Sequence, residues 1–479
     1  MADPYKRLRV LGRGATAHVW LAEGPEGLVA LKVAHQAGHL RREIALLRQL
    51  RHPSIARLVA SDDDGDWLAL EHAPNGTAAE WAPGQPLTQL VEFAARLAEG
   101  LEAVHQAGYV HGDVKPGNVL VAADHTPRLV DMGSATKGRR SSETGATPGY
   151  AAPERLRSGP PTVAGDLWSL GAVLYMLLTR RPPFPGDDPA TLTWAPLATL
   201  PEPPGSIRPR LPSALEDLVL QLLAHRPEAR PASAGRVAEE LRASMLSGMR
   251  PPLVGMGKAR DLLRRTLVDL MGGGRSMVVL HGATGSGRKA LIREVIAASR
   301  REGVRVILPG DGDAILKDLA TEEPAVLAMD GGAVGSEELL LQLLRAPASA
   351  LILVRSDRPM LALARRGARH IQPPPLSLDE VTFLIDALDL DRHRAETVHR
   401  RSGGLPGAVQ GILTPILASS LTPLAQSVLQ NLRSGALTVP VLARRLALGE
   451  HRLLDLVEPM IDRGLVVASA DGVWLSVPR

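Results

Sequence analysis

The run VHGDVKPGNVLV, residues 110–121, is the sequence feature that most constrains how this chain folds. It sets Asp113, Lys115 and Asn118 close together along the chain. Their carboxylate, ammonium and amide groups have the spacing of a loop in which a base, a phosphate-facing cation and a metal ligand converge. The fold around this run therefore has to bring the three side chains to one point.

Upstream of this run, the sequence predicts strands followed by a helix. Apolar residues alternate through LRVLGRG, HVWLA and LVALKVA, which suggests short strands broken by glycine turns. Gly12 and Gly14 stand between the first two strands, where missing side chains let backbone N–H groups approach phosphates. The segment RREIALLRQLRH then carries Ile44, Leu47 and Leu50 on one helical stripe. After about residue 87 the pattern becomes mainly helical.

Further motifs lie on both sides of this run, in a fixed order along the chain. They are VALK at 29–32, Glu43 on the predicted helix, DMG at 131–133, TPGYAAPE at 147–154, DLWSLG at 166–171 and HRPEARPAS at 225–233. A glycine pair or a lone lysine is common in ordinary surface turns, but the whole ordered series is hard to obtain by chance. The series resembles the eukaryotic-like serine/threonine protein kinases of bacteria, and the resemblance covers residues 5–245.

The resemblance implies a bilobal protein kinase fold that uses ATP with Mg²⁺ or Mn²⁺ and acts on Ser or Thr hydroxyls of protein substrates. It implies that ATP is bound by Gly12, Gly14, Val19, Ala30, Lys32, Glu43, Glu71, Ala73 and Leu120. Asp113 would accept or orient the hydroxyl proton, Lys115 would face the transferred phosphoryl, and Lys32 would hold the α and β phosphates. Asn118 and Asp131 would hold the metal. A triphosphate brings about four negative charges, so these cations suit it independently of the resemblance.

Three positions depart from the kinase pattern. Ala17 replaces the third loop glycine, which we expect to be tolerated as long as the backbone angles there stay negative. Met132 replaces the usual Phe of the DFG motif and keeps an apolar plug of similar bulk. Gly112 replaces the Arg that usually clamps a phosphorylated activation loop. We therefore expect activity to depend only weakly on phosphorylation of that loop.

The hydroxyl residues after the DMG motif have two interpretations. Ser141, Ser142 and Thr144 are candidate autophosphorylation sites, but KGRRSS is at least as well explained as a solvated basic loop. Thr147 is better explained as a residue that holds the substrate-binding loop against the catalytic residues than as a regulatory site.

Several other features of this region have structural explanations. We expect Asp166 and the pair of Glu154 with Arg230 to be buried charges that brace loops, without a direct catalytic role. His111 likewise looks like a packing and hydrogen-bonding residue. The proline-rich passage of residues 180–212 predicts a long surface connection, because so many prolines do not fit inside helices or central strands.

The segment SGMRPP, residues 247–252, is the predicted boundary between two regions. Beyond it a helix, a buried strand (SMVVLHG), a glycine loop and a second helix follow one another, which is the order of an α/β nucleotide-binding fold. This order resembles the P-loop ATPases of the STAND and AAA type. PAVLAMD at 324–330 resembles their second strand, and the predicted helices from Ser377 and Arg401 resemble their helical lid.

The glycine loop HGATGSGRKAL, residues 281–291, departs from a working P-loop. After its second glycine it carries Arg288 and Lys289, where the motif has Lys and then Ser or Thr. The Lys289 ammonium would repel Mg²⁺, and Gly331 follows Asp330 where an acid would activate water. The charges therefore argue against hydrolysis. Nucleotide binding through Arg288 stays open, but a loop that only closes a strand and helix turn is the favoured interpretation.

The end of the chain resembles a winged helix. The last strands, VVASADGVWLSV, are joined through an Asp-Gly pair that is a strong hairpin signal. The predicted third helix carries four acidic residues, which are Glu450, Asp455, Glu458 and Asp462. These acids argue against DNA binding, because a recognition helix should be basic. A protein partner or internal packing is the better explanation.

Length and composition fit these assignments. The chain has 479 residues, which suggests two to four domains of roughly 100 to 200 residues each. The predicted fold class is multidomain α+β and α/β, with a kinase domain at 1–246, a P-loop ATPase-like three-layer domain at 253–372, a helical lid at 373–420 and a winged-helix end at 421–479. The net charge of +4 does not point to nucleic acid.

The chain has no cysteine and no apolar run of the roughly 20 residues needed to cross a bilayer. The beginning, MADPYKRLRV, lacks the apolar core of a signal peptide. We therefore expect a cytoplasmic protein without a membrane partner.

Two hypotheses from different classes follow from the sequence. The first is a serine/threonine protein kinase whose C-terminal region recruits substrates or governs activity. The rival is a signalling scaffold in which both nucleotide-binding folds have become interaction modules. The complete set of Lys32, Glu43, Asp113, Asn118 and Asp131 favours the enzyme. A transcription regulator is a third possibility, which the acids of the last helix weaken.

Overall fold

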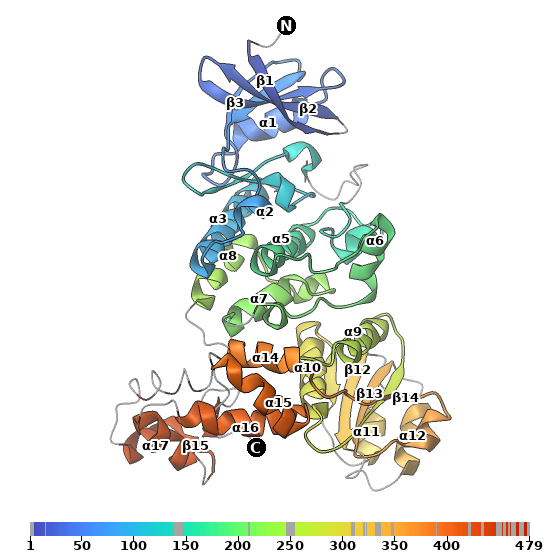
Figure 1. Ribbon diagram of the computed structural model, residues 1–479. Coiled ribbons are helices and arrows are strands. Elements are labelled where there is room, and N and C mark those ends of the chain that lie inside the picture. Colours follow the sequence, from blue (N-terminus) through green and yellow to red (C-terminus); the bar gives the residue numbers. More distant parts are fainter. Residues whose placement is uncertain are drawn as a thin grey trace. The chain divides into compact units, whose positions relative to one another are not determined.

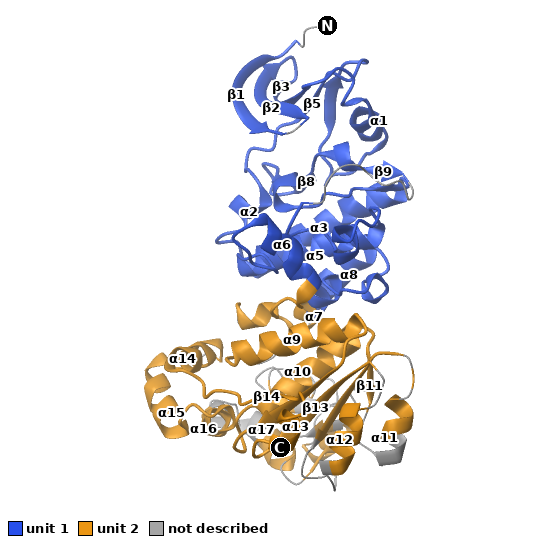
Figure 2. Cartoon of the chain, turned by 90° about the vertical axis from the view of Figure 1, so that its right-hand side faces the viewer, with its two compact units in different colours: residues 1–197, 217–245 blue, residues 198–216, 246–479 orange. Residues whose placement is uncertain are grey.

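The computed structural model describes most of the chain and divides it into two compact units. The described residues are 4–14, 16–137, 147–208, 211–245, 254–307, 312–319, 321, 323–330, 337–345, 349–388, 390–419, 423–432, 435–446, 453, 457, 460, 466–468 and 474–476. The first unit comprises residues 1–197 and 217–245, and the second comprises residues 198–216 and 246–479 (Figure 2). The second unit therefore includes a short segment that, in the sequence, separates the two parts of the first unit.

The first unit begins with a five-stranded antiparallel sheet, ordered β1-β2-β3-β5-β4 (Figure 1). Its strands are β1 (Lys6–Arg13), β2 (Ala17–Gly24), β3 (Gly27–Ala34), β4 (Leu58–Ser61) and β5 (Trp67–Glu71). Val29 and Leu31 of β3, two residues apart as the period of a strand requires, form a core cluster with Ala22 of β2 and Ala69 of β5. Helix α1 (Arg41–Gln49) buries Ile44 and Leu47, and Leu50 is buried just after it, so the predicted helical stripe is confirmed.

Helices dominate the chain from residue 78 to residue 244. They are α2 (Ala78–Trp81), α3 (Leu87–Gln106), α4 (Pro153–Leu156), α5 (Val163–Thr179), α6 (Pro189–Ala198), α7 (Ser213–Leu222) and α8 (Ala234–Ser244). Short 3-10 turns are η1 (Pro116–Asn118), η2 (Met132–Ser134), η3 (Pro204–Ser206) and η4 (Pro227–Ala229). The predicted change from strands to helices is confirmed. In the described ranges, no helix has both the length and the apolar character that a membrane span requires.

Two small ladders lie among these helices and carry the residues of interest. Strand β6 (Tyr109–Val110) pairs with β9 (Thr136–Lys137), and β7 (Val119–Val121) pairs with β8 (Pro127–Leu129). Both pairings are antiparallel. The loop that holds Asp113 runs from β6 to β7, so these short strands fix both of its ends.

The expectation that residues 180–212 form only a surface connection is wrong. Helix α6 lies within this passage and contains the buried Pro196. Pro196 stands in the last turn of the helix, where its missing N–H removes one hydrogen bond without ending the helix earlier. Leu200, which follows α6, is also buried. Most of the passage is nevertheless exposed or half-buried, so what proline content did not predict is the helix and not the surface position.

The second unit is built on a parallel sheet ordered β11-β12-β13-β10-β14. Its strands are β10 (Ser276–His281), β11 (Arg305–Ile307), β12 (Ala325–Asp330), β13 (Ala350–Ser356) and β14 (Arg369–Ile371). The helices around it are α9 (Gly257–Met271), α10 (Arg288–Arg301), α11 (Gly312–Leu319), α12 (Glu337–Arg345) and α13 (Leu361–Ala364).

Successive side chains of β10 face opposite sides of this sheet, as the period of a strand requires. Val278 and Leu280 belong to a core cluster with α9 and α10, whereas Met277 and Val279 belong to a cluster with α11 and α12. Both faces of the sheet are thus covered by helices, which explains why its strands are apolar throughout. The α/β order predicted for this region is confirmed.

Two helical groups follow the sheet. The first consists of α14 (Leu378–Ala387), η5 (Arg392–Arg394), α15 (Ala395–Ser402) and α16 (Pro406–Ser419), and most of its buried side chains form one cluster. The second consists of α17 (Pro423–Leu432), β15 (Leu437–Thr438), α18 (Val439–Arg445), β16 (Val467–Ala468) and β17 (Trp474–Ser476). Strands β16 and β17 pair antiparallel, so the predicted terminal hairpin is confirmed. The Asp-Gly turn and the four acidic residues named above lie outside the described residues.

Candidate active site

Lys32 on β3 stands at the centre of a charged group. Its Nζ lies 2.8 Å from Glu43 Oε2 on α1 and 2.7 Å from Asp131 Oδ1, just after β8. The Lys32 side chain is 13% exposed and the Glu43 side chain 2% exposed. The three residues are far apart in sequence, and the sheet, the helix and the loop after β8 bring them together. This is the arrangement that the motifs predict.

The three pKa values of this group are shifted by burial and by mutual attraction. Burial alone would lower the pKa of Lys32, but the negative charges of Glu43 and Asp131 outweigh it and raise the pKa above 10.5. Burial raises the pKa of Glu43 above its ordinary value of 4.5, against the opposing effect of Lys32. Burial also disfavours the charged form of Asp131, but Lys32 holds the pKa of that carboxyl below 3.8. Lys32 and Asp131 are therefore charged at neutral pH.

The loop between β6 and β7 gathers a second group around Asp113. Lys115 Nζ lies 2.6 Å from Asp113 Oδ2, and the Thr147 hydroxyl donates to Asp113 Oδ1 at 2.6 Å. Lys115 also donates to Thr147 Oγ1 at 3.0 Å. Asn118 Nδ2 donates to the Asp113 carbonyl at 2.8 Å and to its carboxylate at 3.1 Å. The prediction that Thr147 holds its loop against Asp113 and Lys115 is confirmed.

Asp166 on α5 braces the start of this loop. It is 2% exposed, and its carboxylate accepts the backbone N–H groups of His111 and Gly112, each at 2.8 Å. His105 on α3 lies 2.9 Å from the same carboxylate. His111 is fully buried, and its ring nitrogens bond the backbone of Val130 and of the loop itself. The predicted structural roles of Asp166 and His111 are confirmed.

Glu154 and Arg230 form the second predicted brace. The guanidinium makes two hydrogen bonds to the carboxylate, at 2.6 and 2.9 Å. Arg230 is 5% exposed, and its guanidinium also lies over the ring of Trp168, 5.1 Å from the centroid. A buried arginine needs such a complete set of partners, and here they tie α4 to α5 and to the turn before α8.

The glycine loop lies between β1 and β2. Gly12 pairs with Val19 across the two strands, with a register shift just before it, and Gly14 N–H donates to the Ala17 carbonyl at 2.9 Å. Ala17 is a buried residue of β2 and is not among the residues with positive φ. The expectation that its backbone angles stay negative is therefore confirmed, and the extra methyl group causes no strain there.

The residues expected beside the adenine include members of β3, β5 and β7. Ala30 on β3 pairs with Leu70 on β5, and Leu120 lies on β7. The Glu71 carboxylate accepts from Arg128 Nε at 2.7 Å and from a backbone N–H. The Glu71 side chain thus fixes the end of β5, so only its backbone is left for the base.

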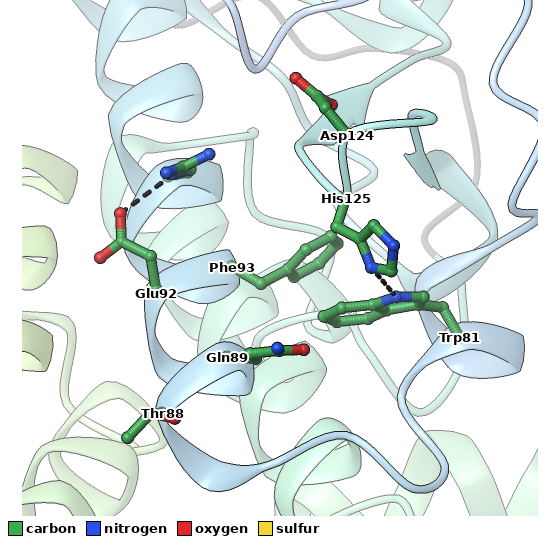
Figure 3. A pocket seen from close by; sticks show the side chains of 8 residues that line it. Trp81, Thr88, Gln89, Glu92, Phe93, Asp124 and His125 are labelled. Atoms are coloured by element: carbon green, nitrogen blue, oxygen red, sulfur yellow. Dashed lines mark hydrogen bonds and ion pairs between the residues drawn. The ribbon is translucent and has the colours of Figure 1, made fainter.

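A cavity of about 490 Å³ lies elsewhere in the first unit, against α2, α3 and the turn between β7 and β8 (Figure 3). Trp81 stacks on Phe93 with ring centroids 4.5 Å apart, and its Nε1 donates to His125 Nδ1 at 2.9 Å. Glu92 pairs with Arg96 at 3.0 Å. Trp81 on α2 thus bonds the β7–β8 turn and packs on α3, and none of the predicted site residues lines the cavity.

The glycine loop of the second unit has its own internal partners. Arg288 begins α10 and is 6% exposed. Its Nη1 donates to the Ser356 carbonyl, and its Nη2 lies 2.9 Å from Asp357 Oδ1, so the guanidinium is bound to the end of β13. The backbone N–H of Gly407 donates to the Gly285 carbonyl at 2.8 Å, which ties the start of α16 to the loop.

Two supporting residues were missed by the sequence analysis. His105 bonds Asp166, and Arg128 bonds Glu71. Each is a lone polar residue on a helix or strand, where a solvated surface position is the usual explanation. Only their tertiary partners reveal that they support the catalytic loop and the end of β5.

Comparison with known proteins agrees with this geometry. Residues 5–243 match the family described as the protein kinase domain. The chain is 32% identical over 263 residues to the DNA damage-responsive serine/threonine-protein kinase RqkA of Deinococcus radiodurans, covering 50% of this chain and 39% of that protein. It is 30% identical over 285 residues to the serine/threonine-protein kinase PknE of Mycobacterium tuberculosis, covering 55% and 49%.

The serine/threonine-protein kinase PknH of Mycobacterium bovis gives a third comparison. It is 32% identical over 258 residues, covering 50% of this chain and 43% of that protein. The chain thus spans less than half the length of these curated relatives. The family match, the kinase relatives and the gathered Lys32 and Asp113 groups lead to one conclusion. Residues 5–243 are a protein kinase domain, similar to those of the bacterial serine/threonine-protein kinases named above.

Proposed function

We propose that this chain transfers the γ-phosphoryl group of ATP to Ser or Thr hydroxyls of proteins, and that its C-terminal region regulates this activity or recruits substrates. The observation that carries the proposal is the Lys32 ammonium placed between Glu43 and Asp131. In a protein kinase this ion pair has to be in place for transfer. A scaffold would have no need to keep three ionisable groups together in a buried place.

The substrate hydroxyl would react at Asp113. The oxygen of the substrate hydroxyl forms a bond to the γ-phosphorus of ATP. The bond from that phosphorus to the β–γ bridging oxygen breaks, and ADP leaves. Asp113 takes or orients the hydroxyl proton, and Lys115 faces the negative charge of the transferred group. Thr147 bonds both residues and so fixes their geometry.

Asn118 and Asp131 are the residues that would hold Mg²⁺. Both offer oxygen ligands, which Mg²⁺ prefers, and one or two protein ligands with phosphate and water complete such sites. The Asn118 amide nitrogen is used by Asp113, which directs its Oδ1 away from that bond. The low pKa of Asp131 keeps its carboxylate charged for a cation. The bound metal would neutralise charge on the phosphates.

Transfer of labelled phosphate from ATP to the protein itself and to a generic basic protein tests the proposal. We expect Asp113→Asn to lower kcat by about 10²- to 10⁴-fold, the usual contribution of a general base. We expect Lys32→Met to lower kcat by about 10²- to 10³-fold, as for the loss of one transition-state donor. Asp124→Asn, in the exposed β7–β8 turn, is the matched control and should leave transfer unchanged.

The absence of transfer by the wild-type chain with either Mg²⁺ or Mn²⁺ would sink the enzyme proposal and favour the scaffold. Activity of Asp113→Asn equal to that of the wild type would show that another base acts. Each outcome is read from the same gel or filter assay, with correct folding checked by circular dichroism.

For the second unit we propose an ATPase-like domain that does not hydrolyse ATP, followed by a helical lid and a winged-helix end. The parallel strand order and the two helix layers support this assignment. Arg288 is committed to Ser356 and Asp357, and Lys289 is exposed. No Ser or Thr hydroxyl follows to hold Mg²⁺ in the P-loop manner. The residues therefore do not fit a catalytic metal–nucleotide site.

One observation favours nucleotide binding without hydrolysis in this loop. The Ser286 hydroxyl is 4% exposed and has no hydrogen-bond partner among the described residues. Binding of a non-hydrolysable ATP analogue, measured by calorimetry, separates the alternatives. If the second loop binds no nucleotide, there will be one site per chain, weakened in Lys32→Met and unchanged in Arg288→Ala. A second site that disappears in Arg288→Ala would show that the second loop binds nucleotide.

The partner proposed for the C-terminal end is a protein. The acids predicted to weaken DNA binding lie outside the described residues, so the argument rests on the sequence alone. A cytoplasmic location likewise stays a prediction from the sequence.

A further inference from the structure

Residues 198–216 belong to the kinase domain by sequence and to the second unit by structure. The kinase family match runs from residue 5 to residue 243 and so contains this segment. In the structure, however, the segment belongs to the same compact unit as residues 246–479 (Figure 2). The segment begins at Ala198, the last residue of α6, and ends at Glu216, inside α7. Part of the sequence that matches the kinase family thus belongs to the second unit.

Leu200 anchors the segment in the core of the second unit. It is 8% exposed and belongs to the cluster formed by the inner faces of α9 and α10 and by alternate side chains of the sheet. Met256, Ala259 and Leu263 are members of the same cluster. A leucine buried in this way holds its backbone in place, because its release would return apolar surface to water.

Arg260 on α9 adds a polar anchor beside it. This arginine is 3% exposed, and its guanidinium lies 2.9 Å from Glu294 on α10. The same guanidinium donates to Ser206 Oγ at 3.0 Å and lies 3.7 Å from Glu202. A buried arginine is stable only with such partners, so part of its pairing depends on residues of the segment. Its planar fork reaches three groups at once, which a lysine does not do.

The other end of α6 reaches the loop that holds the catalytic residues. A Cβ built at Gly149 would meet the Leu192 side chain of α6 at 3.5 Å, so this leucine packs over the Gly149 backbone. Gly149 lies two residues after Thr147, which bonds Asp113 and Lys115. A continuous series of contacts and covalent bonds thus runs from the catalytic loop, along α6, to Leu200 and its segment.

From this series we propose that the second unit controls protein-substrate binding by holding residues 198–216, and with them α6, in place. Leu200 and Arg260 are positioning residues in this scheme, and neither touches ATP or the reacting atoms. The inference rests on the proposed kinase function and specifies how the C-terminal region regulates it. Release of the segment loosens α6 against the substrate loop and weakens substrate binding, while the Lys32 group and ATP binding stay unchanged.

The test compares Arg260→Gln with Arg264→Gln in the full-length chain. Arg264 is the matched control, because it lies one turn further along α9 and its ion pairs are with Glu294 and Asp261, neither of which belongs to the segment. We expect Arg260→Gln to raise the KM for a basic protein substrate by about 5-fold or more, a typical size for coupling between sites. The KM for ATP should not change. Arg264→Gln should keep the wild-type value for the protein substrate.

Hydrogen exchange of residues 198–208 reports on the docking itself. It should rise in Arg260→Gln and stay at the wild-type level in Arg264→Gln. Leu200→Ala and Ser206→Ala remove smaller parts of the same anchor and guard against general misfolding. They should raise the hydrogen exchange of the segment and the KM for the protein substrate by less than Arg260→Gln does. Arg260→Lys should have a KM between those of Arg260→Gln and the wild type.

Several outcomes would overturn the inference. One is an active wild type in which Arg260→Gln and Arg264→Gln have the same KM for the protein substrate. Another is increased exchange of the segment without any change in that KM. An equal rise in the KM for ATP would point to a general loss of structure instead. A wild type without phosphate transfer would refute the proposed function first, and this inference with it.

Discussion

Gly112 is a residue whose backbone conformation explains a departure from the kinase pattern. Its φ is +80°, a left-handed conformation that favours glycine, and its N–H donates to Asp166 Oδ1. A Cβ at this position would meet the Ser134 carbonyl at 3.3 Å. An arginine at this position would therefore strain the start of the catalytic loop. The sequence predicts the loss of an arginine clamp, and the structure supplies the local reason.

We expect Gly112→Ala to lower the free energy of unfolding by about 1 to 2 kcal/mol, the cost of a left-handed residue with a side chain. Chemical denaturation followed by tryptophan fluorescence measures it. Gly117→Ala is the matched control, because that glycine has no positive φ and open space around its Cβ position. Equal stability of Gly112→Ala and the wild type would show that the loop tolerates a side chain there.

Glu43 is the residue expected to limit ATP binding at acid pH. Its pKa is raised above 4.5 and that of Asp131 is held below 3.8, so on acidification Glu43 is protonated first. Lys32 then keeps only Asp131 as a charged partner and is less firmly placed. We expect ATP affinity to fall as the pH decreases through the raised pKa of Glu43, measured by fluorescence titration.

Glu43→Gln tests this assignment because its side chain does not ionise. Its ATP affinity should be lower than that of the wild type at neutral pH and should lack the acid limb that begins above pH 4.5. The same acid limb in Glu43→Gln would assign it to another group.

At the scale of elements, Arg242 is one of the residues that join α3 and α8. Arg242 on α8 lies 3.0 Å from Glu92 and 2.6 Å from Glu99, both on α3. The hydrogen bond from Arg242 lowers the pKa of Glu92 below 4.5. The helix faces themselves follow from the apolar periodicity of each segment, whereas this pairing of two distant helices does not.

We expect Arg242→Ala to lower the free energy of unfolding by about 1 kcal/mol or less at pH 7, because exposed pairs contribute about 0.2 to 1 kcal/mol each and salt screens them. A carboxylate whose pKa is lowered by folding stabilises the fold at pH values above its pKa in the unfolded chain. This stabilisation is lost as the pH falls through its pKa in the folded protein. The difference from the wild type should therefore shrink below pH 4.5. Denaturation at several pH values measures it.

Arg236→Ala is the control for this prediction. Arg236 lies on the same helix but pairs with Glu240 within that helix, so its loss does not separate α8 from α3. A larger loss of unfolding free energy in Arg236→Ala than in Arg242→Ala would contradict the proposal that Arg242 joins α8 to α3.

At the scale of the whole molecule, the order of the sequence and the compact units do not coincide. The predicted boundary at SGMRPP lies outside the described residues, between the described ranges that end at 245 and begin at 254. Residues 198–216 come before that boundary in the sequence, yet in the structure they belong to the second unit. A boundary drawn from composition follows the chain, whereas burial follows contacts that sequence order does not record.

A chain that ends at residue 245 should therefore be less stable than the kinase part of the full-length protein. It would expose Leu200, and covering one leucine contributes about 1.5 to 3 kcal/mol. We expect a lower Tm and faster protease cleavage within residues 198–208, both of which thermal denaturation and limited proteolysis measure. Identical Tm and cleavage in the two proteins would show that the segment is held by the kinase part itself.

The sequence by itself determined the kinase part and predicted its candidate site. The Lys32, Glu43, Asp113 and Asp131 positions could be predicted because phosphoryl transfer needs those groups at motif spacings, and apolar periodicity placed them on a strand, a helix and loops. The tertiary structure alone decided the supports: His105 on Asp166, Arg288 on β13, and Leu200 in the second unit. These depend on which distant surfaces meet, and that is set by burial and partner geometry, for which local sequence carries no signal.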